Sequence, residues 1–108
     1  MQKGEVWIVE FQSVNGHEQY GLRPAIIIED TNTSVVIVIP CTANLHALRF
    51  PFTLRLDPSK KNGLDAATVI LLIQLRAIDR MRFVRKNGVI EQNTLIKINR
   101  LLKTLLGL

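Results

Sequence analysis

The chain contains few of the residues and patterns that define several protein classes. Its 108 residues include one cysteine, so no intramolecular disulfide can form and a secreted disulfide scaffold is excluded. No apolar run approaches the roughly 18 consecutive residues that a membrane helix requires, and the N-terminus lacks the apolar segment of a signal peptide. We therefore expect a single domain over residues 1–108, located in the cytoplasm and without a membrane partner.

Metal-binding and phosphate-binding motifs are also missing. His17, His46 and Cys41 show none of the spacings typical of zinc ligands, and the chain has no glycine-rich phosphate loop. We expect no metal site and no cofactor. Two interpretations of Cys41 stay open: a nucleophile with His46 as its base, or a small buried residue at the end of a strand.

Positive charge, by contrast, is in excess. Fourteen Lys and Arg residues stand against nine Asp and Glu, a formal net charge of +5. Between Arg76 and Lys86 the basic residues are opposed only by Asp79. This surplus favours a polyanionic partner, with nucleic acid the first candidate. A basic run is equally typical of an exposed strand edge, where cations discourage unwanted strand pairing.

Alternating and β-branched residues predict that most of the chain forms strands. The expected strands cover Glu5–Phe11, Ala25–Ile28 after Arg23-Pro24, Val35–Ile39, Phe52–Leu56, Ala67–Ile73 and Met81–Arg85. The run at 25–28 is continuously apolar, which is typical of a central strand. Pro40 is expected to end its strand, and Asn87-Gly88 predicts a turn.

The C-terminal segment has the spacing of a helix. Leu95, Ile98, Leu102 and Leu105 fall on one stripe, which must be buried against the sheet or a partner. The expected fold is therefore mainly β with a C-terminal helix, as a small barrel or a strongly twisted sheet.

Arg23 stands where a long polar loop, Ser13–Leu22, meets a strand. An arginine held at such a boundary is suited to bind phosphate through two parallel hydrogen bonds. It could instead be a structural residue that pairs with Glu18 or Glu29. Composition alone does not decide between these two roles.

The order of several segments resembles one family. Gly4–Val9, Gly16–Gln19, Arg23–Ile28, Ile39–Thr42 and Gln74–Asp79 together resemble the MazF/PemK/Kid toxin endoribonucleases over essentially the whole chain. The resemblance implies a small SH3-like β-barrel that forms a homodimer. It implies sequence-specific, metal-independent cleavage of single-stranded mRNA. It also implies a partner antitoxin, whose acidic, disordered C-terminal segment occupies the RNA-binding surface.

The resemblance also suggests site residues. Arg23 and Thr42 match the catalytic arginine and threonine of the family. The residues expected to bind RNA are Glu18 and Gln19 in the polar loop, Gln74 and Arg76 in the segment beside the active groove or the dimer interface, and Arg80 and Arg82 in the basic run.

One position departs from the family pattern. Ile73 stands where some members carry an acidic residue, and an isoleucine cannot transfer a proton. His17 is the nearby side chain whose type ordinarily titrates near neutral pH, so it is our candidate for proton transfer. The alternative is that His17 stacks on a base.

Two other functions compete with the nuclease. Gyrase-poisoning toxins of the CcdB type depend on a Trp-Gly-Ile end to the last helix, whereas this chain ends in 104–108 without tryptophan, its single one being Trp7. The second rival is a non-catalytic nucleic-acid-binding barrel with Tyr20, Phe50 and Phe83 as stacking platforms.

Overall fold

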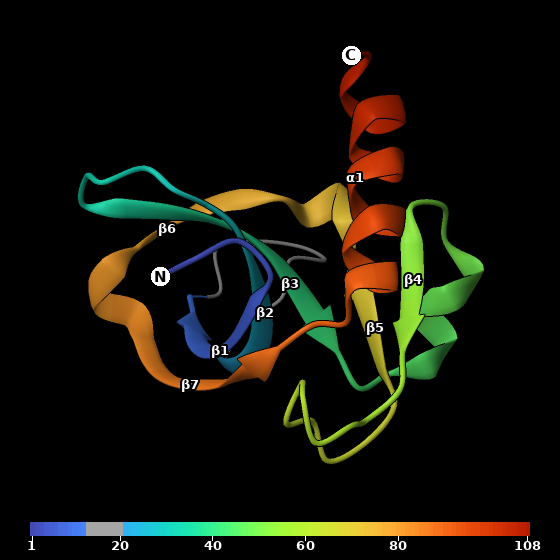
Figure 1. Cartoon of the computed structure of the whole chain (residues 1–108), viewed down its shortest axis with the longest axis horizontal. Coiled ribbons are helices and arrows are strands. Elements are labelled where there is room, and N and C mark those ends of the chain that lie inside the picture. The colour runs from blue at the N-terminus through green and yellow to red at the C-terminus, as the bar shows by residue number, and fades with distance from the viewer. Residues whose placement is uncertain (13–20) are drawn as a thin grey trace.

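The computed structural model describes residues 1–12 and 21–108, and shows one strongly curved sheet with a single α-helix packed beside it (Figure 1). In chain order the elements are β1 (Glu5–Phe11), β2 (Gly21–Asp30), β3 (Val35–Thr42), the 3₁₀ turn η1 (Leu45–Arg49), β4 (Thr53–Leu56), β5 (Thr68–Leu71), η2 (Leu72–Gln74), β6 (Arg76–Asp79), η3 (Arg80–Arg82), β7 (Phe83–Val89) and α1 (Gln92–Leu106).

All the strand pairs are antiparallel. The order across the sheet is β4-β5-β3-β2-β1-β7, and β6 pairs separately with β3. Since β6 continues into β7 through η3, strands β1, β2, β3, β6 and β7 curve around a common interior (Figure 1). The prediction of a mainly β, SH3-like barrel with a C-terminal helix is confirmed in this barrel-like form.

The central strands are buried on both faces, which explains their continuous apolar sequence. Ala25 and Ile27 of β2 face the barrel interior together with Val36 and Val38 of β3. The intervening Ile26 faces a second core, on the side of the helix. Strand β2 lies between β1 and β3, so the predicted central position is confirmed.

Helix α1 closes the second core. Ile98 and Leu102 are buried in it, and Leu95 and Leu105 pack against its edge, so the predicted stripe is confirmed and buried within the chain itself. Gly107 ends the helix in the left-handed conformation that glycine tolerates best, with φ of 70°. No helix in the described part of the chain has the length and apolarity needed to cross a membrane.

Several predicted boundaries differ from the structure. Pro40 does not end its strand, because β3 continues to Thr42. It falls between the part of β3 that pairs with β6 and the part that pairs with β5, a gap where a residue without an N–H is tolerated. The strand predicted over Ala67–Ile73 stops at Leu71, and Ile73 lies on η2 with 60% of its surface exposed.

Asn87-Gly88 is not a turn but part of β7, which begins at Phe83 rather than Met81. Gly88 is required there because a neighbouring turn approaches closely: a Cβ at this position would lie 2.4 Å from the carbonyl oxygen of Lys61. The backbone N–H of Val89 donates to the same oxygen at 2.8 Å. A contact between distant segments therefore selects this glycine.

Asn62 in that neighbouring turn is fully buried and satisfied by hydrogen bonds. Its Oδ1 accepts the backbone N–H groups of Ser59 and Leu64, and its Nδ2 donates to Glu91 at the start of the helix. Hydrogen bonds from Ser59 and Asn62 lower the pKa of Glu91 against the opposing effect of burial. This cluster of hydrogen bonds holds the turn against the start of α1.

Candidate active site

The two predicted catalytic residues lie at the same end of neighbouring strands. The β2–β3 pairing runs as far as Ala25 opposite Pro40. Arg23 lies two residues before Ala25 in β2, and Thr42 lies two residues after Pro40 in β3. Side chains two residues apart point to the same face of a strand, and the two strands run in opposite directions. The fold therefore places both residues at one end of this ladder.

These two residues present complementary hydrogen-bond donors. Arg23 is exposed, and within the described residues it forms no ion pair with Glu29. Glu18, its other suggested partner, lies outside the described residues. Thr42 is only 8% exposed, and its Oγ1 accepts the backbone N–H of Asn44 at 3.2 Å, which leaves its hydroxyl proton to donate. A guanidinium and a hydroxyl at one strand end can together bind a phosphate.

A groove begins directly beyond Thr42. Asn44 caps η1 by accepting the backbone N–H of His46 at 3.1 Å. The groove has a volume of about 550 Å³. The polar and apolar side chains that line it include Asn44, His46, Arg49, Phe50, Ile73 and Gln74. A second hollow, from Ile73 to Arg76, continues along η2. Gln74 therefore lines both hollows, and Arg76 lines the second one.

Arg76 also has a structural contact. Its guanidinium carbon lies 4.6 Å from the ring centre of Phe11, at the end of β1. Phe11 itself is almost completely buried in the barrel interior. A cation over an aromatic face is stabilising, so this arginine helps to fix the end of β1. RNA binding by Arg76 and Gln74 stays a prediction.

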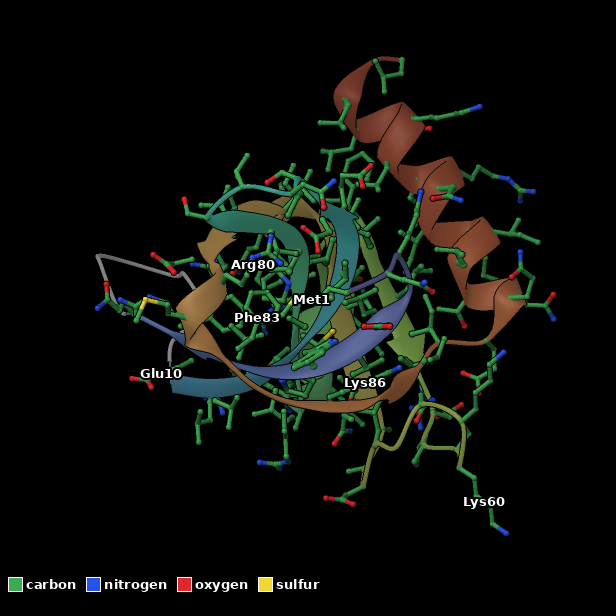
Figure 2. All side chains as sticks on the ribbon, turned by 60° about the vertical axis from the view of Figure 1, so that its left-hand side comes forward. Met1, Glu10, Lys60, Arg80, Phe83 and Lys86 are labelled. Atoms are coloured by element: carbon green, nitrogen blue, oxygen red, sulfur yellow. The ribbon has the colours of Figure 1, made fainter. Side chains whose placement is uncertain are left out.

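Arg80 is held in an ion pair at the opposite end of β2. Its two terminal nitrogens contact the carboxylate of Asp30 at 2.6 and 3.1 Å, and its Nη1 lies 3.8 Å from the sulfur of Met1 (Figure 2). Its Nε and Nη2 also donate to the carbonyl of Thr33. The hydrogen bonds from Arg80 and from the backbone of Asn32 hold the pKa of Asp30 at about 2, below its ordinary 3.8.

The RNA-binding role predicted for Arg80 stays a prediction, and it competes with this ion pair. Arg82, two residues on, is half-buried on η3, and its predicted role is equally untested. Lys86 in β7 pairs with Glu5 at 3.3 Å. The basic run thus divides into side chains that hold the barrel together and others that do not, a distinction that the sequence does not contain.

Cys41 is a structural residue. It is 1% exposed in the second core, where burial raises the pKa of its thiol to about 12. The interpretation of Cys41 as a nucleophile is therefore wrong, and the buried alternative is confirmed. His46 instead lies exposed in the groove. His17, Glu18 and Gln19 lie outside the described residues, and their roles stay predictions.

The sequence suggests no site role for Arg49, and it suggests His46 only as a base for a nucleophilic Cys41. Both line the groove because η1 and η2, which are far apart in the sequence, meet there. No local signal in either segment indicates this meeting. Among the residues that the structure describes, no group of three His, Cys, Asp or Glu side chains could hold a metal ion.

Comparisons with known proteins show which family the chain is similar to. Residues 2–106 match the family of PemK-like, MazF-like toxins of type II toxin–antitoxin systems. The endoribonuclease MazF of Staphylococcus epidermidis is 32% identical over 112 aligned residues, which cover the whole chain and 92% of that relative. The MazF of Staphylococcus saprophyticus gives the same identity and coverage.

Solved structures show the same fold. A crystal structure of MazF from Deinococcus radiodurans superposes with a TM-score of 0.83 at 25% identity, covering all of this chain and 97% of that one. A mycobacterial endoribonuclease in complex with its cognate antitoxin has a TM-score of 0.74 at 21% identity, covering 98% and 94%. The family match along nearly the whole chain, the relatives above 30% identity and the shared barrel show that this protein belongs to the PemK-like, MazF-like toxins of type II toxin–antitoxin systems.

Proposed function

We propose that the protein is an endoribonuclease that cuts single-stranded mRNA at specific sequences, without a metal ion, by attack of a ribose 2′-hydroxyl. The observation that carries the proposal is the placement of Arg23 and Thr42 at the same end of β2 and β3. Support from other proteins is that two curated relatives, each 32% identical to this chain, are named endoribonucleases.

The reaction makes one bond and breaks another. The 2′-oxygen bonds to the adjacent phosphorus while the bond from phosphorus to the 5′-oxygen breaks, leaving a 2′,3′-cyclic phosphate and a free 5′-hydroxyl. Negative charge accumulates on the non-bridging oxygens in the transition state. Arg23 can donate two parallel N–H bonds to them and Thr42 one O–H bond, and donors held in place for developing charge lower the barrier.

Two protons must also move. One leaves the 2′-hydroxyl and one reaches the departing 5′-oxygen. Arginine is a poor base, and Ile73 at the groove has no proton to transfer. We assign proton transfer to His17, in the loop whose Glu18 and Gln19 are proposed to recognise RNA. Gln74, Arg76 and Arg82 are proposed to contact the RNA backbone or bases.

The proposal includes two protein partners. One is an antitoxin whose acidic, disordered C-terminal segment competes with RNA for the basic surface predicted around Arg23, Arg80, Arg82 and Arg85. Its affinity should fall as salt rises, because charge pairing dominates such contacts. The other partner is a second copy of the chain. Homodimerisation is supported by the family resemblance, and light scattering at micromolar concentration tests it.

One experiment separates the nuclease from its rivals. The purified protein is incubated with a long, unstructured RNA in excess EDTA, and the products are mapped. Discrete cuts that leave a cyclic phosphate support the proposal, and a substrate with deoxyribose at the cut site should stay intact. Binding without cleavage would indicate a non-catalytic binding module, and trapping of gyrase on DNA would indicate a gyrase poison.

A further inference from the structure

We propose that Phe50, with Arg49 against its ring, is a stacking platform for one nucleobase of the RNA strand and so helps to select the cut sequence. This inference rests on the proposed function, because it names a specificity-determining part of the same site. It also assigns a ligand group to the η1 side of the groove between η1 and η2, where the proposed function names no residue.

The ring of Phe50 is presented to solvent by a fixed backbone. It is 54% exposed and belongs to neither apolar core, so folding does not account for its aromatic character. Its backbone N–H donates to the carbonyl of Ala47 at 3.1 Å, and its carbonyl accepts the hydroxyl of Thr53 at 3.0 Å. A rigid mount for an exposed ring reduces the entropy lost when a ligand stacks on it.

Arg49 adds a cation to this platform. Its guanidinium carbon lies 4.8 Å from the centre of the Phe50 ring, within the range of a cation–π contact. Aromatic rings and arginine planes are the surfaces on which unstacked bases of single-stranded RNA rest. The positive charge beside the ring also suits a ligand that carries phosphates, and it disfavours a basic partner.

The groove beside the ring offers groups that can bind the edge of a base. Its volume of about 550 Å³ lies within the range of pockets that hold small ligands. Asn44 uses its Oδ1 for the backbone of His46, so its side-chain N–H groups are what it can offer a ligand. The His46 imidazole and the Gln74 amide line the same space. Amide and imidazole groups around a stacking ring are suited to read base edges.

The platform is adjacent to the proposed chemistry. Asn44 at the groove donates its backbone N–H to Thr42 Oγ1 at 3.2 Å. A base held on Phe50 therefore belongs to a nucleotide near the phosphate that Arg23 and Thr42 bind. Its identity would influence which phosphate reaches those donors, and this is how the platform contributes to the choice of cut site.

The test measures stacking separately from cleavage. The probes are short RNAs in which fluorine replaces every 2′-hydroxyl, so that they cannot be cut, and in which one base is 2-aminopurine, whose fluorescence falls on stacking. We expect quenching with the native protein. Phe50→Ala should weaken binding by about 5- to 150-fold and abolish the quenching. Phe50→Trp should retain both signals. Leu48→Ala, an exposed neighbour on η1 outside the groove lining, is the matched control and should bind normally.

Cut-site mapping then tests the selection of sequence. On a long RNA, Phe50→Ala should redistribute cleavage among sites, whereas Leu48→Ala should not. Normal binding, quenching and cut sites in Phe50→Ala would overturn the platform. So would a binding loss explained by a change in oligomeric state, measured by light scattering, since the ring would then be a contact between copies. If the native protein binds and quenches but does not cut RNA, the proposed function fails and the platform stands.

Discussion

The two ends of the β2–β3 ladder each carry an arginine, and the two arginines are held in opposite ways. At one end Arg80 directs its donors to Asp30 and Thr33. At the other end Arg23 is exposed, with no ion pair to another described residue. Both count equally in the net charge of the chain. The comparison shows that equal charges can have different partners, so the partners of each guanidinium, and not the number of cations in a segment, are the basis for choosing Arg23 as the candidate phosphate-binding residue.

The largest effect is expected from Arg23→Ala. Loss of one transition-state donor lowers turnover by about 10²–10³-fold. RNA binding should weaken far less, because several cations share the ground-state contacts. Single-turnover cleavage and binding measured on one preparation check this. Arg23→Lys should recover only part of the rate, since a point charge cannot make the two-pronged contact. A stable, fully active Arg23→Ala protein would remove this residue from the site.

Thr42→Ala should lower turnover by about 10²-fold, since it removes a neutral donor beside Arg23. Thr42→Ser keeps the hydroxyl that accepts from Asn44 and is proposed to donate to the phosphate, so it should retain most activity. Cleavage rates of the two variants, compared at equal folded concentration, check this. Equal rates for Ala and Ser would show that the hydroxyl has no part in the reaction.

Arg80→Ala should change stability rather than chemistry. The substitution leaves Asp30 without its arginine and the Thr33 carbonyl without two donors. We expect the melting temperature to fall by a few degrees while cleavage per folded molecule stays within about twofold, because no transition-state donor is lost. Thermal melts and single-turnover rates are the measurements. A stable Arg80→Ala protein that has lost RNA binding would reverse the assignment of the two arginines.

The smallest expected effect is a loss of stability at acidic pH. The pKa of Asp30 is about 2 in the folded protein against an ordinary 3.8, so its ion pair stabilises the fold above about pH 4. That contribution is lost as the pH falls from about 4 towards 2, where the folded carboxylate also becomes protonated. Melting curves of the native chain and Asp30→Asn should therefore differ near neutral pH and converge in this window. A difference that is as large at pH 2 as at neutral pH would point to another cause.

Much of the fold was predictable because periodicity reports burial. Strand β1 has the predicted bounds, and the helix buries its predicted stripe. The failures have a common cause in contacts between distant segments. Gly88 is in a strand because the backbone of Lys61 approaches it, and Pro40 is tolerated because β3 changes partners there. Local sequence contains neither fact.

The candidate site can be proposed from the sequence only through the order of its motifs. Arg23 and Thr42 are candidates because they match a family pattern, and the fold places both at one strand end. The groove was not predictable. Phe50 and Ile73 line it together although they lie more than twenty residues apart, and nothing in either segment marks the other as its neighbour.

Because β2 and β3 are buried on both faces, their register is specified in an unusual way. In most sheets a one-residue slip moves apolar side chains into water, and this cost fixes the pairing. In this protein a one-residue slip of β2 would move Ile26 from the helix-side core to the barrel interior and Ile27 the other way, so both side chains would stay buried. Burial of apolar side chains therefore distinguishes poorly between the two registers, and the native register must be selected by features that form in that register alone. One such feature is the register shift between Ile27 and Glu29, and the other is the ion pair between Asp30 and Arg80. Arg80 therefore helps to specify the β2–β3 register, at the end of the ladder opposite the candidate active site.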